Sequence, residues 1–220
     1  MPVDIKFLQK EKIIAIIRSI PLKDMKKTGD ALYKGGIRLI EVAFDHAKPD
    51  GIDQTLESLH QLRTSLPEDV HLGAGTVLSE KEVKSAFETG AEFIISPNTD
   101  PAVIRKTKDL GMLSMPGAMT PSEIASAYQA GGDIIKLFPA DFLGPSYVKA
   151  LRGPLGHIPL AAVGGISQEN IRSWQDVGVQ VFGIGSSLVS PVLVREGRFK
   201  ELTDRALEFL QIVHPDSALG

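Results

Sequence analysis

The chain has 220 residues, of which 43% are hydrophobic, and a formal net charge of −3. This length suits one α/β domain with a sizeable core. The charge argues against nucleic acid as the main partner, because proteins that bind the phosphate backbone carry a basic face. The absence of cysteine excludes disulfides, cysteine nucleophiles and thiolate metal sites.

Membrane attachment and export are not expected either. No apolar run approaches the roughly 20 residues that cross a bilayer. The first residues, Met1 to Lys6, lack the apolar segment of a signal peptide. The sequence therefore predicts a cytoplasmic protein without a membrane partner.

One pattern recurs along the chain: a helix-like segment ends in glycine, and a short β-branched strand follows at once. Gly90, Gly111, Gly131 and Gly178 are examples. Glycine tolerates the left-handed conformation that ends a helix. The strands that follow are nearly continuous apolar runs, as in a parallel sheet that is buried on both faces. The pattern predicts repeated βα units.

Eight such units can be counted in chain order. The predicted strands are Ile13–Ile17, Leu39–Phe44, Leu72–Thr76, Phe93–Ser96, Leu113–Met115, Ile134–Phe138, Leu160–Val163 and Val181–Ile184. The predicted helices are Leu22–Lys34, Ile52–Ser65, Glu80–Thr89, Pro101–Asp109, Pro121–Gln129, Pro145–Leu151, Gln168–Val177 and Phe199–Val213. Eight units predict a single (β/α)8 TIM barrel over residues 1–220. An open doubly wound sheet is the alternative, but its usual G-x-G-x-x-G first turn is absent.

Arg18 ends the first predicted strand. Active sites of such barrels lie at the C-terminal ends of the strands, so polar residues there are candidates for function. An arginine in this position suits a carboxylate or a phosphate. A solvated arginine at the rim explains the residue equally well by itself.

Glu41 lies in the second strand, on the same face as Leu39 and Ala43. It can move protons during catalysis, or it can simply pair with a buried cation. Asp45 and His46 follow at the end of this strand, so a divalent metal site built on Glu41, Asp45 and His46 is a minor alternative. The five histidines are scattered and none has the i, i+4 spacing of a helical ligand pair, so we expect no metal cofactor.

Lys136 is the most informative residue, because it lies in a strand that is otherwise apolar. Alternation places Ile134, Lys136 and Phe138 on the face that points into the barrel. Desolvation lowers the pKa of a buried lysine, and the neutral amine attacks carbonyl carbons. A structural lysine paired with an inward glutamate is the competing interpretation, and spacing alone leaves both open.

Glycine-rich turns end three strands. Gly75 precedes Thr76 at the end of the third strand, while Gly164-Gly165 and Gly185-Ser186 follow the seventh and eighth. The loops after the last two strands form the recurrent phosphate site of these barrels. Tight turns between crowded strand ends are the alternative explanation.

These residues together resemble the family of 2-keto-3-deoxy-6-phosphogluconate (KDPG) aldolase, also called 2-keto-4-hydroxyglutarate (KHG) aldolase, a class I pyruvate-dependent aldolase. The resemblance covers about residues 13–213. The motifs that carry it, in chain order, are Ile40-Glu41-Val42, Gly73-Ala74-Gly75-Thr76-Val77-Leu78, Ile95-Ser96-Pro97, Pro116-Gly117, Lys136-Leu137-Phe138-Pro139-Ala140, Gly164-Gly165-Ile166 and Gly185-Ser186.

The resemblance implies a role for each matching residue. Lys136 matches the imine-forming lysine and Glu41 the acid/base glutamate, while Thr76 helps to hold the pyruvate carboxylate. Apolar walls around the imine match Pro97 and Phe138. Phosphate-binding turns match Gly164, Gly165, Gly185 and Ser186. The family is usually a homotrimer and needs no metal, so we expect no cofactor beyond the covalent Schiff base.

The sequence departs from the family pattern at two positions. Some members have a carboxylate-binding arginine four residues after the glutamate, where this chain has Asp45. Members that lack it often have an arginine at the end of strand one, so the carboxylate is assigned to Arg18. Val163 stands where gluconate-type enzymes often have threonine, as in related 6-phosphogalactonate aldolases, which affects discrimination at C4.

The resulting expectation is a class I aldolase that reversibly cleaves KDPG to pyruvate and glyceraldehyde 3-phosphate, with KHG cleavage to pyruvate and glyoxylate as a second activity. Two alternatives stay open: an aldolase for 2-keto-3-deoxy-6-phosphogalactonate, and a non-catalytic barrel that binds a phosphorylated sugar acid. The expected partners are a phosphorylated 2-keto acid and pyruvate.

Overall fold

The structure of the protein, a computed structural model, describes residues 3–215. Its strands are all parallel and form one sheet in the order β5-β4-β3-β2-β1-β9-β8-β7-β6. They are β1 (Ile13–Ile17), β2 (Leu39–Ala43), β3 (His71–Gly75), β4 (Phe93–Ile95), β5 (Leu113–Met115), β6 (Gly117–Ala118), β7 (Ile135–Leu137), β8 (Leu160–Val163) and β9 (Val181–Ile184). The predicted strand ends differ from these by at most one residue.

Segments β5 and β6 are two halves of one barrel strand, interrupted only at Pro116. Proline has no N–H, so it breaks the regular ladder at that point. The first half pairs with β4 and the second with β7. Across the break, the Asp133 and Lys136 N–H groups donate to the carbonyls of Ser114 and Pro116, each at 2.9 Å. The ring of strands thus closes as the predicted eight-stranded barrel.

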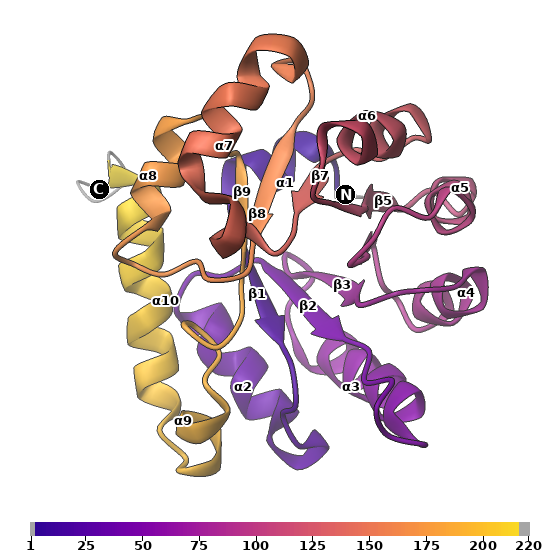
Figure 1. Cartoon of the computed structure of the whole chain (residues 1–220). Coiled ribbons are helices and arrows are strands. Elements are labelled where there is room, and N and C mark those ends of the chain that lie inside the picture. The colour runs from indigo at the N-terminus through magenta and orange to yellow at the C-terminus, as the bar shows by residue number, and fades with distance from the viewer. Residues whose placement is uncertain (1–2, 216–220) are drawn as a thin grey trace.

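Helices lie outside this ring of strands (Figure 1). They are α1 (Ile5–Glu11), α2 (Leu22–Lys34), α3 (Gly51–Ser65), α4 (Glu80–Glu88), α5 (Pro101–Asp109), α6 (Pro121–Gln129), α7 (Ala140–Leu155), α8 (Ile171–Asp176), α9 (Pro191–Arg195) and α10 (Phe199–Val213). Among the helices of residues 3–215, none combines the length and the apolar character needed to cross a membrane.

Several helices begin at a polar capping residue. Thr120 forms a complete capping box with Glu123 at the start of α6. Asp100 accepts from the Ala102 N–H at 2.8 Å and precedes the proline that begins α5. These caps satisfy N–H groups that have no partner within the helix. They fix the helix starts close to the strand ends that form the barrel mouth.

Several helical details differ from the prediction. Helices α1 and α9 are additional, α7 covers Ala140–Leu155 rather than Pro145–Leu151, and α8 begins at Ile171 rather than at Gln168. Gly144 interrupts α7 with φ 72° and ψ 163°, so the predicted helix is the part after this kink. Helix α1 has seven residues and α9 has five. Both are too short for a periodic pattern to be recognised in the sequence.

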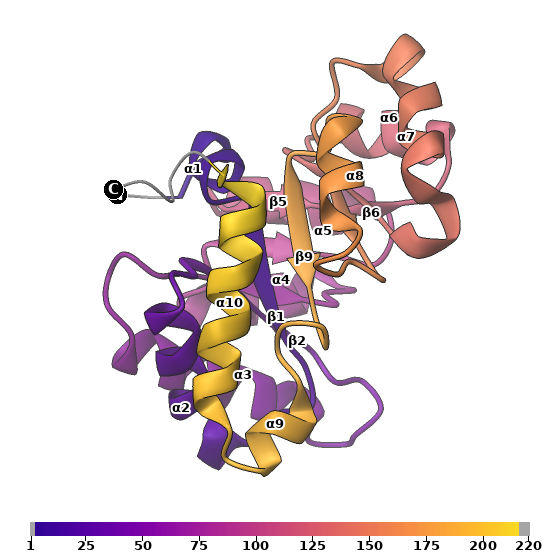
Figure 2. The ribbon, with the colours of Figure 1, turned by 90° about the vertical axis from the view of Figure 1, so that its left-hand side faces the viewer.

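Helix α1 covers the N-terminal end of the barrel. Leu8 is fully buried and packs into the interior cluster with Ile14, Leu39 and Ile134. The Phe7 ring meets the His71 ring edge-on at the start of β3. Figure 2 shows α1 beside the C-terminal end of α10, where Lys12 Nζ donates to the Val213 carbonyl at 2.8 Å. One end of the barrel is therefore closed by apolar side chains.

Strand side chains that do not point into the barrel interior point outward and pack against the helices. Ile135 and Leu137 of β7 belong to this outer core, whereas Ile134 belongs to the interior. The alternation predicted for Lys136 and its neighbours is confirmed. Because of this alternation, every second side chain at the C-terminal ends of the strands points toward the barrel axis.

Candidate functional site

Lys136 lies in the middle of β7, and its side chain points into the barrel. It is 6% exposed. Its Nζ lies 4.4 Å from the centroid of the Phe138 ring. Burial lowers the pKa of this amine, Glu41 raises it and Arg18 lowers it further, with a net shift downward from the ordinary value. A lowered pKa increases the fraction of neutral amine, which is the nucleophilic form.

Glu41 reaches the same interior from β2. It is 2% exposed, and its Oε2 has no hydrogen-bond partner. Burial raises the pKa of this carboxyl group, although Lys136 and Arg18 oppose the shift. Its carboxyl group lies against Gly75, where an added Cβ would be 1.5 Å from Oε1. Only glycine at that position leaves space for the carboxyl group.

Lys136 and Glu41 influence each other electrostatically without forming a direct ion pair: no contact within 4.0 Å joins the two charged groups. A purely structural ion pair would bring them into contact and satisfy the carboxylate. Instead, one group has a lowered pKa and the other a raised one. Both shifts favour the uncharged forms, the amine and the carboxylic acid, and these forms suit attack on a carbonyl followed by proton transfer.

Arg18 and Thr76 meet at the mouth of the barrel. The Arg18 Nη2 donates to the Thr76 Oγ1 at 3.0 Å. Thr76 has a left-handed backbone with φ 58°, which is uncommon for a β-branched residue. Arg18 is exposed and acts electrostatically on both Glu41 and Lys136. A guanidinium held beside a hydroxyl above the buried amine is suited to a carboxylate.

The predicted apolar residues lie around these groups. Gly117 pairs with Lys136 across β6 and β7, and an added Cβ on Gly117 would be 2.3 Å from the Pro97 carbonyl carbon. Pro97 is therefore a close neighbour of β6, the strand that pairs with the lysine-bearing β7. Phe138 covers the lysine from its own strand. Val163 ends β8 and is 6% exposed.

A cleft of about 370 Å³ at the mouth brings most of the predicted binding residues together. Those that line it are Arg18, Phe138, Val163, Gly164, Gly185 and Ser186. In the described part of the chain, no protein acceptor is found for the backbone N–H groups of Gly165, Gly185 and Ser186. Free N–H groups at two adjacent turns suit an anion.

The first of these turns requires glycine for two reasons. Gly164 and Gly165 have φ values of 101° and 70°, which other residues rarely adopt. A Cβ on Gly165 would also lie 2.4 Å from the Cβ of Asp141, at the start of α7. Asp141 is not among the predicted site residues, because nothing in the sequence places it against the β8 turn.

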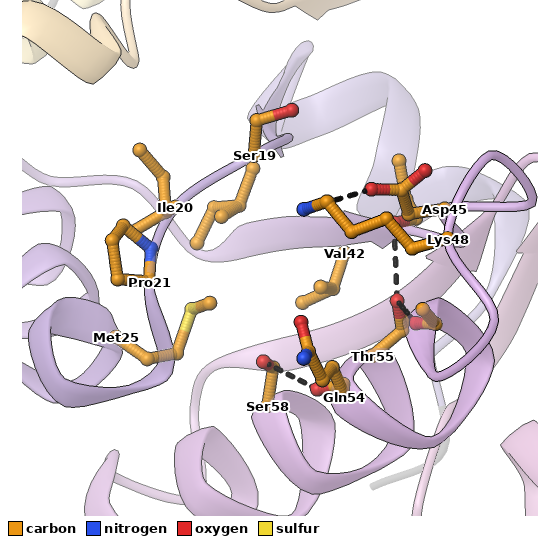
Figure 3. A pocket seen from close by; sticks show the side chains of 13 residues that line it. Ser19, Ile20, Pro21, Met25, Val42, Asp45, Lys48, Gln54, Thr55 and Ser58 are labelled. Carbon is orange, nitrogen blue, oxygen red and sulfur yellow. Dashed lines mark hydrogen bonds and ion pairs between the residues drawn. The ribbon is translucent and has the colours of Figure 1, made fainter.

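The side chains of Glu41, Asp45 and His46, the alternative metal site, do not come together as a set of ligands. Asp45 Oδ2 pairs with Lys48 Nζ at 3.2 Å, and Figure 3 shows these two groups facing each other. His46 Nε2 lies 3.1 Å from Glu82 Oε1 on α4. Within residues 3–215, no group of three His, Asp or Glu side chains is arranged to hold a metal ion.

Asp45 and Lys48 border a second hollow of about 270 Å³, outside β1 and β2 and next to α2 and α3 (Figure 3). Ser19 lines both this hollow and the cleft at the mouth. It follows Arg18 directly and has a left-handed backbone with φ 57°. Sequence reasoning missed Ser19, because a serine in a strand-to-helix turn is common and its backbone strain leaves no sequence pattern.

Comparison with known proteins gives a consistent result. The model of the KDPG and KHG aldolase family matches residues 5–204. A probable 2-dehydro-3-deoxy-6-phosphogalactonate aldolase of Rhizobium meliloti is 37% identical over 81% of this chain and 82% of its own length. A 2-dehydro-3-deoxy-phosphogluconate aldolase of Haemophilus influenzae is 29% identical over 95% of this chain and 96% of its own length.

Solved structures agree with these relatives. The structure described as native KDPGal superimposes with a TM-score of 0.82 at 30% identity, covering 94% of this chain and 96% of that one. The prefixes 2-dehydro and 2-keto denote the same ketone, and KDPGal is the galactonate counterpart of KDPG.

Proposed function

Because this chain belongs to the KDPG and KHG aldolase family and is therefore a carbon–carbon lyase, we propose that Lys136 cleaves a phosphorylated 2-keto-3-deoxy sugar acid through a Schiff base. The observation that carries the assignment is the burial of Lys136 in the same interior as a buried Glu41 whose Oε2 has no hydrogen-bond partner. The lowered pKa of the amine and the raised pKa of the carboxyl group support the two roles.

The reaction begins when the neutral Lys136 amine attacks the C2 ketone of the substrate and forms a carbinolamine. Glu41 donates a proton to the leaving hydroxyl, so that water departs and the protonated imine forms. This cation accepts the electrons of the C3–C4 bond when the Glu41 carboxylate, which has given its proton to the departing water, removes the C4 hydroxyl proton. The bond breaks, and an aldehyde leaves while an enamine of pyruvate stays on the lysine. Protonation at C3 and hydrolysis release pyruvate and restore the amine.

The remaining roles follow from position. Arg18 and Thr76 hold the carboxylate next to C2, because their side chains meet at the mouth above the lysine. Pro97 and Phe138 exclude water from the imine. The turns at Gly164-Gly165 and Gly185-Ser186 bind the phosphate through backbone N–H groups. The reaction so described uses no metal or other cofactor.

The galactonate-derived compound is the substrate we favour. The first two relatives by identity, at 37% and 33%, are both named for phosphogalactonate. Val163 supports the same assignment, because it offers no hydroxyl to the substrate where gluconate-type enzymes often have threonine. The phosphogluconate compound is the second candidate, since relatives that match 95% and 94% of this chain have that name.

Borohydride reduction in the presence of pyruvate tests the Schiff base. We expect Lys136 to gain the mass of a reduced pyruvyl group, found by peptide mass spectrometry. The Lys136→Met variant should gain none. An adduct on another lysine, or no adduct on the wild-type protein, would contradict the proposal.

The condensation direction tests the substrate. Both epimers give the same pyruvate and glyceraldehyde 3-phosphate on cleavage, because C4 becomes the aldehyde carbon. Condensation regenerates C4, so the ratio of the two products measures the preference directly. We expect the galacto product to exceed the gluco product, and Val163→Thr to shift the ratio toward gluco. An unchanged ratio would remove Val163 from the specificity assignment.

The homotrimer implied by the family resemblance also stays a prediction. Light scattering at the concentrations used for kinetics would test it.

A further inference from the structure

The phosphate site proposed above depends on two turns that come from different strands. Gly164-Gly165 follows β8, and Gly185-Ser186 follows β9. Neither turn is part of a regular ladder, and both lie at the exposed mouth of the barrel. Backbone N–H groups can hold a phosphate only if both turns keep a fixed position relative to each other. The structure shows two side chains that provide this constraint.

Asn170 constrains the first turn. Its Nδ2 donates to the Gly165 carbonyl at 2.7 Å, and its Oδ1 accepts from the Ser167 N–H at 2.9 Å. The side-chain amide therefore bridges both ends of the β8 turn. It occupies the Gly165 carbonyl, while the Gly165 N–H has no protein acceptor among the described residues.

Ser187 links the second turn to the first. Its Oγ donates to the Ile166 carbonyl at 2.6 Å, directly after Gly165. Its own carbonyl accepts from Arg205 Nη1 of α10 at 3.3 Å. The Gly185 carbonyl is also occupied, since it accepts the N–H groups of Leu188 and Val189 at 2.9 and 2.7 Å.

We propose that Asn170 and Ser187 are positioning residues that hold the β8 and β9 turns in the geometry that binds the substrate phosphate. Neither side chain lines the cleft, so both act through the backbone of the turns. The inference rests on the proposed function, because it concerns the phosphate end of that same site. The amine and carboxyl groups on β7 and β2 make no hydrogen bond with either residue, so imine chemistry is expected to proceed without them.

Two assays separate the two ends of the site. Exchange of the pyruvate methyl protons in D₂O, followed by NMR, needs the lysine and the proton-transfer group but no phosphate. Condensation of pyruvate with glyceraldehyde 3-phosphate, compared with unphosphorylated glyceraldehyde, measures the contribution of the phosphate. Wild-type protein should strongly prefer the phosphorylated aldehyde.

Ser187→Ala and Asn170→Ala should each reduce kcat/KM for glyceraldehyde 3-phosphate by about 10- to 100-fold, the loss expected when positioning fails by up to an ångström. Methyl-proton exchange and kcat/KM for glyceraldehyde should stay within about twofold of wild type. Ser187→Thr retains the hydroxyl and should recover much of the preference for phosphate. Ser58→Ala is the matched control, because it also loses a hydroxyl donated to a carbonyl, that of Gln54 at 2.8 Å on α3.

The outcomes distinguish the two proposals. Equal losses in both assays would mean a general structural role and would overturn the inference. The inference would also be overturned if Ser187→Ala and Asn170→Ala kept the wild-type preference for the phosphorylated aldehyde, which is the result expected for the control Ser58→Ala. If wild-type protein shows methyl-proton exchange but no preference for phosphate, the proposed phosphate site itself is wrong and the inference fails with it. A selective loss of the phosphate preference supports the inference.

Discussion

The two ends of the barrel interior differ sharply, although the same strands build both. Ile134, directly before β7, faces the closed end and Lys136 of β7 faces the mouth; on β2, Leu39 and Glu41 repeat the arrangement. The closed end is apolar and sealed by Leu8 of α1. The mouth holds a buried amine and a carboxyl oxygen without a hydrogen-bond partner.

The comparison separates stability from chemistry. Burial of apolar side chains at the closed end contributes about 25 cal/mol per Å² to folding. Burial of unpaired ionisable groups at the mouth opposes folding, since each loses its hydration. Two inward-facing residues that are only two positions apart, such as Leu39 and Glu41, therefore serve packing and catalysis respectively. Four substitutions test this division, in order of decreasing expected effect on catalysis.

Lys136→Met should have the largest effect. Loss of the amine removes the nucleophile, so aldol cleavage should fall by about 10⁴-fold or more. Because methionine needs no hydration, the free energy of unfolding should stay equal or rise by about 1 kcal/mol. Steady-state kinetics and thermal denaturation measure the two quantities. A strongly destabilised variant would show that Lys136 supports the fold.

Glu41→Gln should lower kcat by about 10²- to 10⁴-fold, the range for loss of general acid–base catalysis. It should also change the pH dependence of pyruvate trapping by borohydride. Glu41 raises the pKa of Lys136 in the wild type, so its removal lowers that pKa further. The amine then becomes neutral at lower pH, and the acidic limb of the trapping profile should move to lower pH.

Arg18→Ala provides the matched control for this shift, because Arg18 acts on Lys136 in the opposite direction. Its removal raises the pKa of the amine, and the acidic limb should move to higher pH. Shifts of the two variants in the same direction would contradict the electrostatic assignment.

Leu8→Ala tests the closed end and should have the smallest effect on catalysis. The side chain is fully buried, so the cavity should reduce the free energy of unfolding by about 2–5 kcal/mol. The kcat/KM at a temperature where the variant is folded should stay within about twofold of wild type. Urea denaturation and kinetics on the same preparation check both parts.

Much of the fold could be predicted because parallel barrels leave a strong local pattern. Glycine after each helix and a continuous apolar strand are set by neighbouring residues alone. Lys136 and Glu41 were found for a related reason: a charged residue within an apolar strand stands out without any knowledge of its partner. The family motifs then assigned chemistry to them.

The additional short helices and the split strand were not predicted. Helix α1 is only seven residues long, and its position depends on packing of Leu8 into the barrel end rather than on its own periodicity. The interruption at Pro116 was visible as a residue, but its consequence depends on pairing with β4 on one side and β7 on the other.

The sequence by itself determined the repeated βα units, the inward direction of Lys136 and Glu41, and the glycine turns, since alternation and backbone conformation are local properties. Only the tertiary structure decided that the amine and the carboxyl group are both buried without direct pairing, that Arg18 contacts Thr76, and that Ser187 links the β8 and β9 turns. These relations join residues from different βα units. Closure of the barrel sets the distances between them, and no local pattern records those distances.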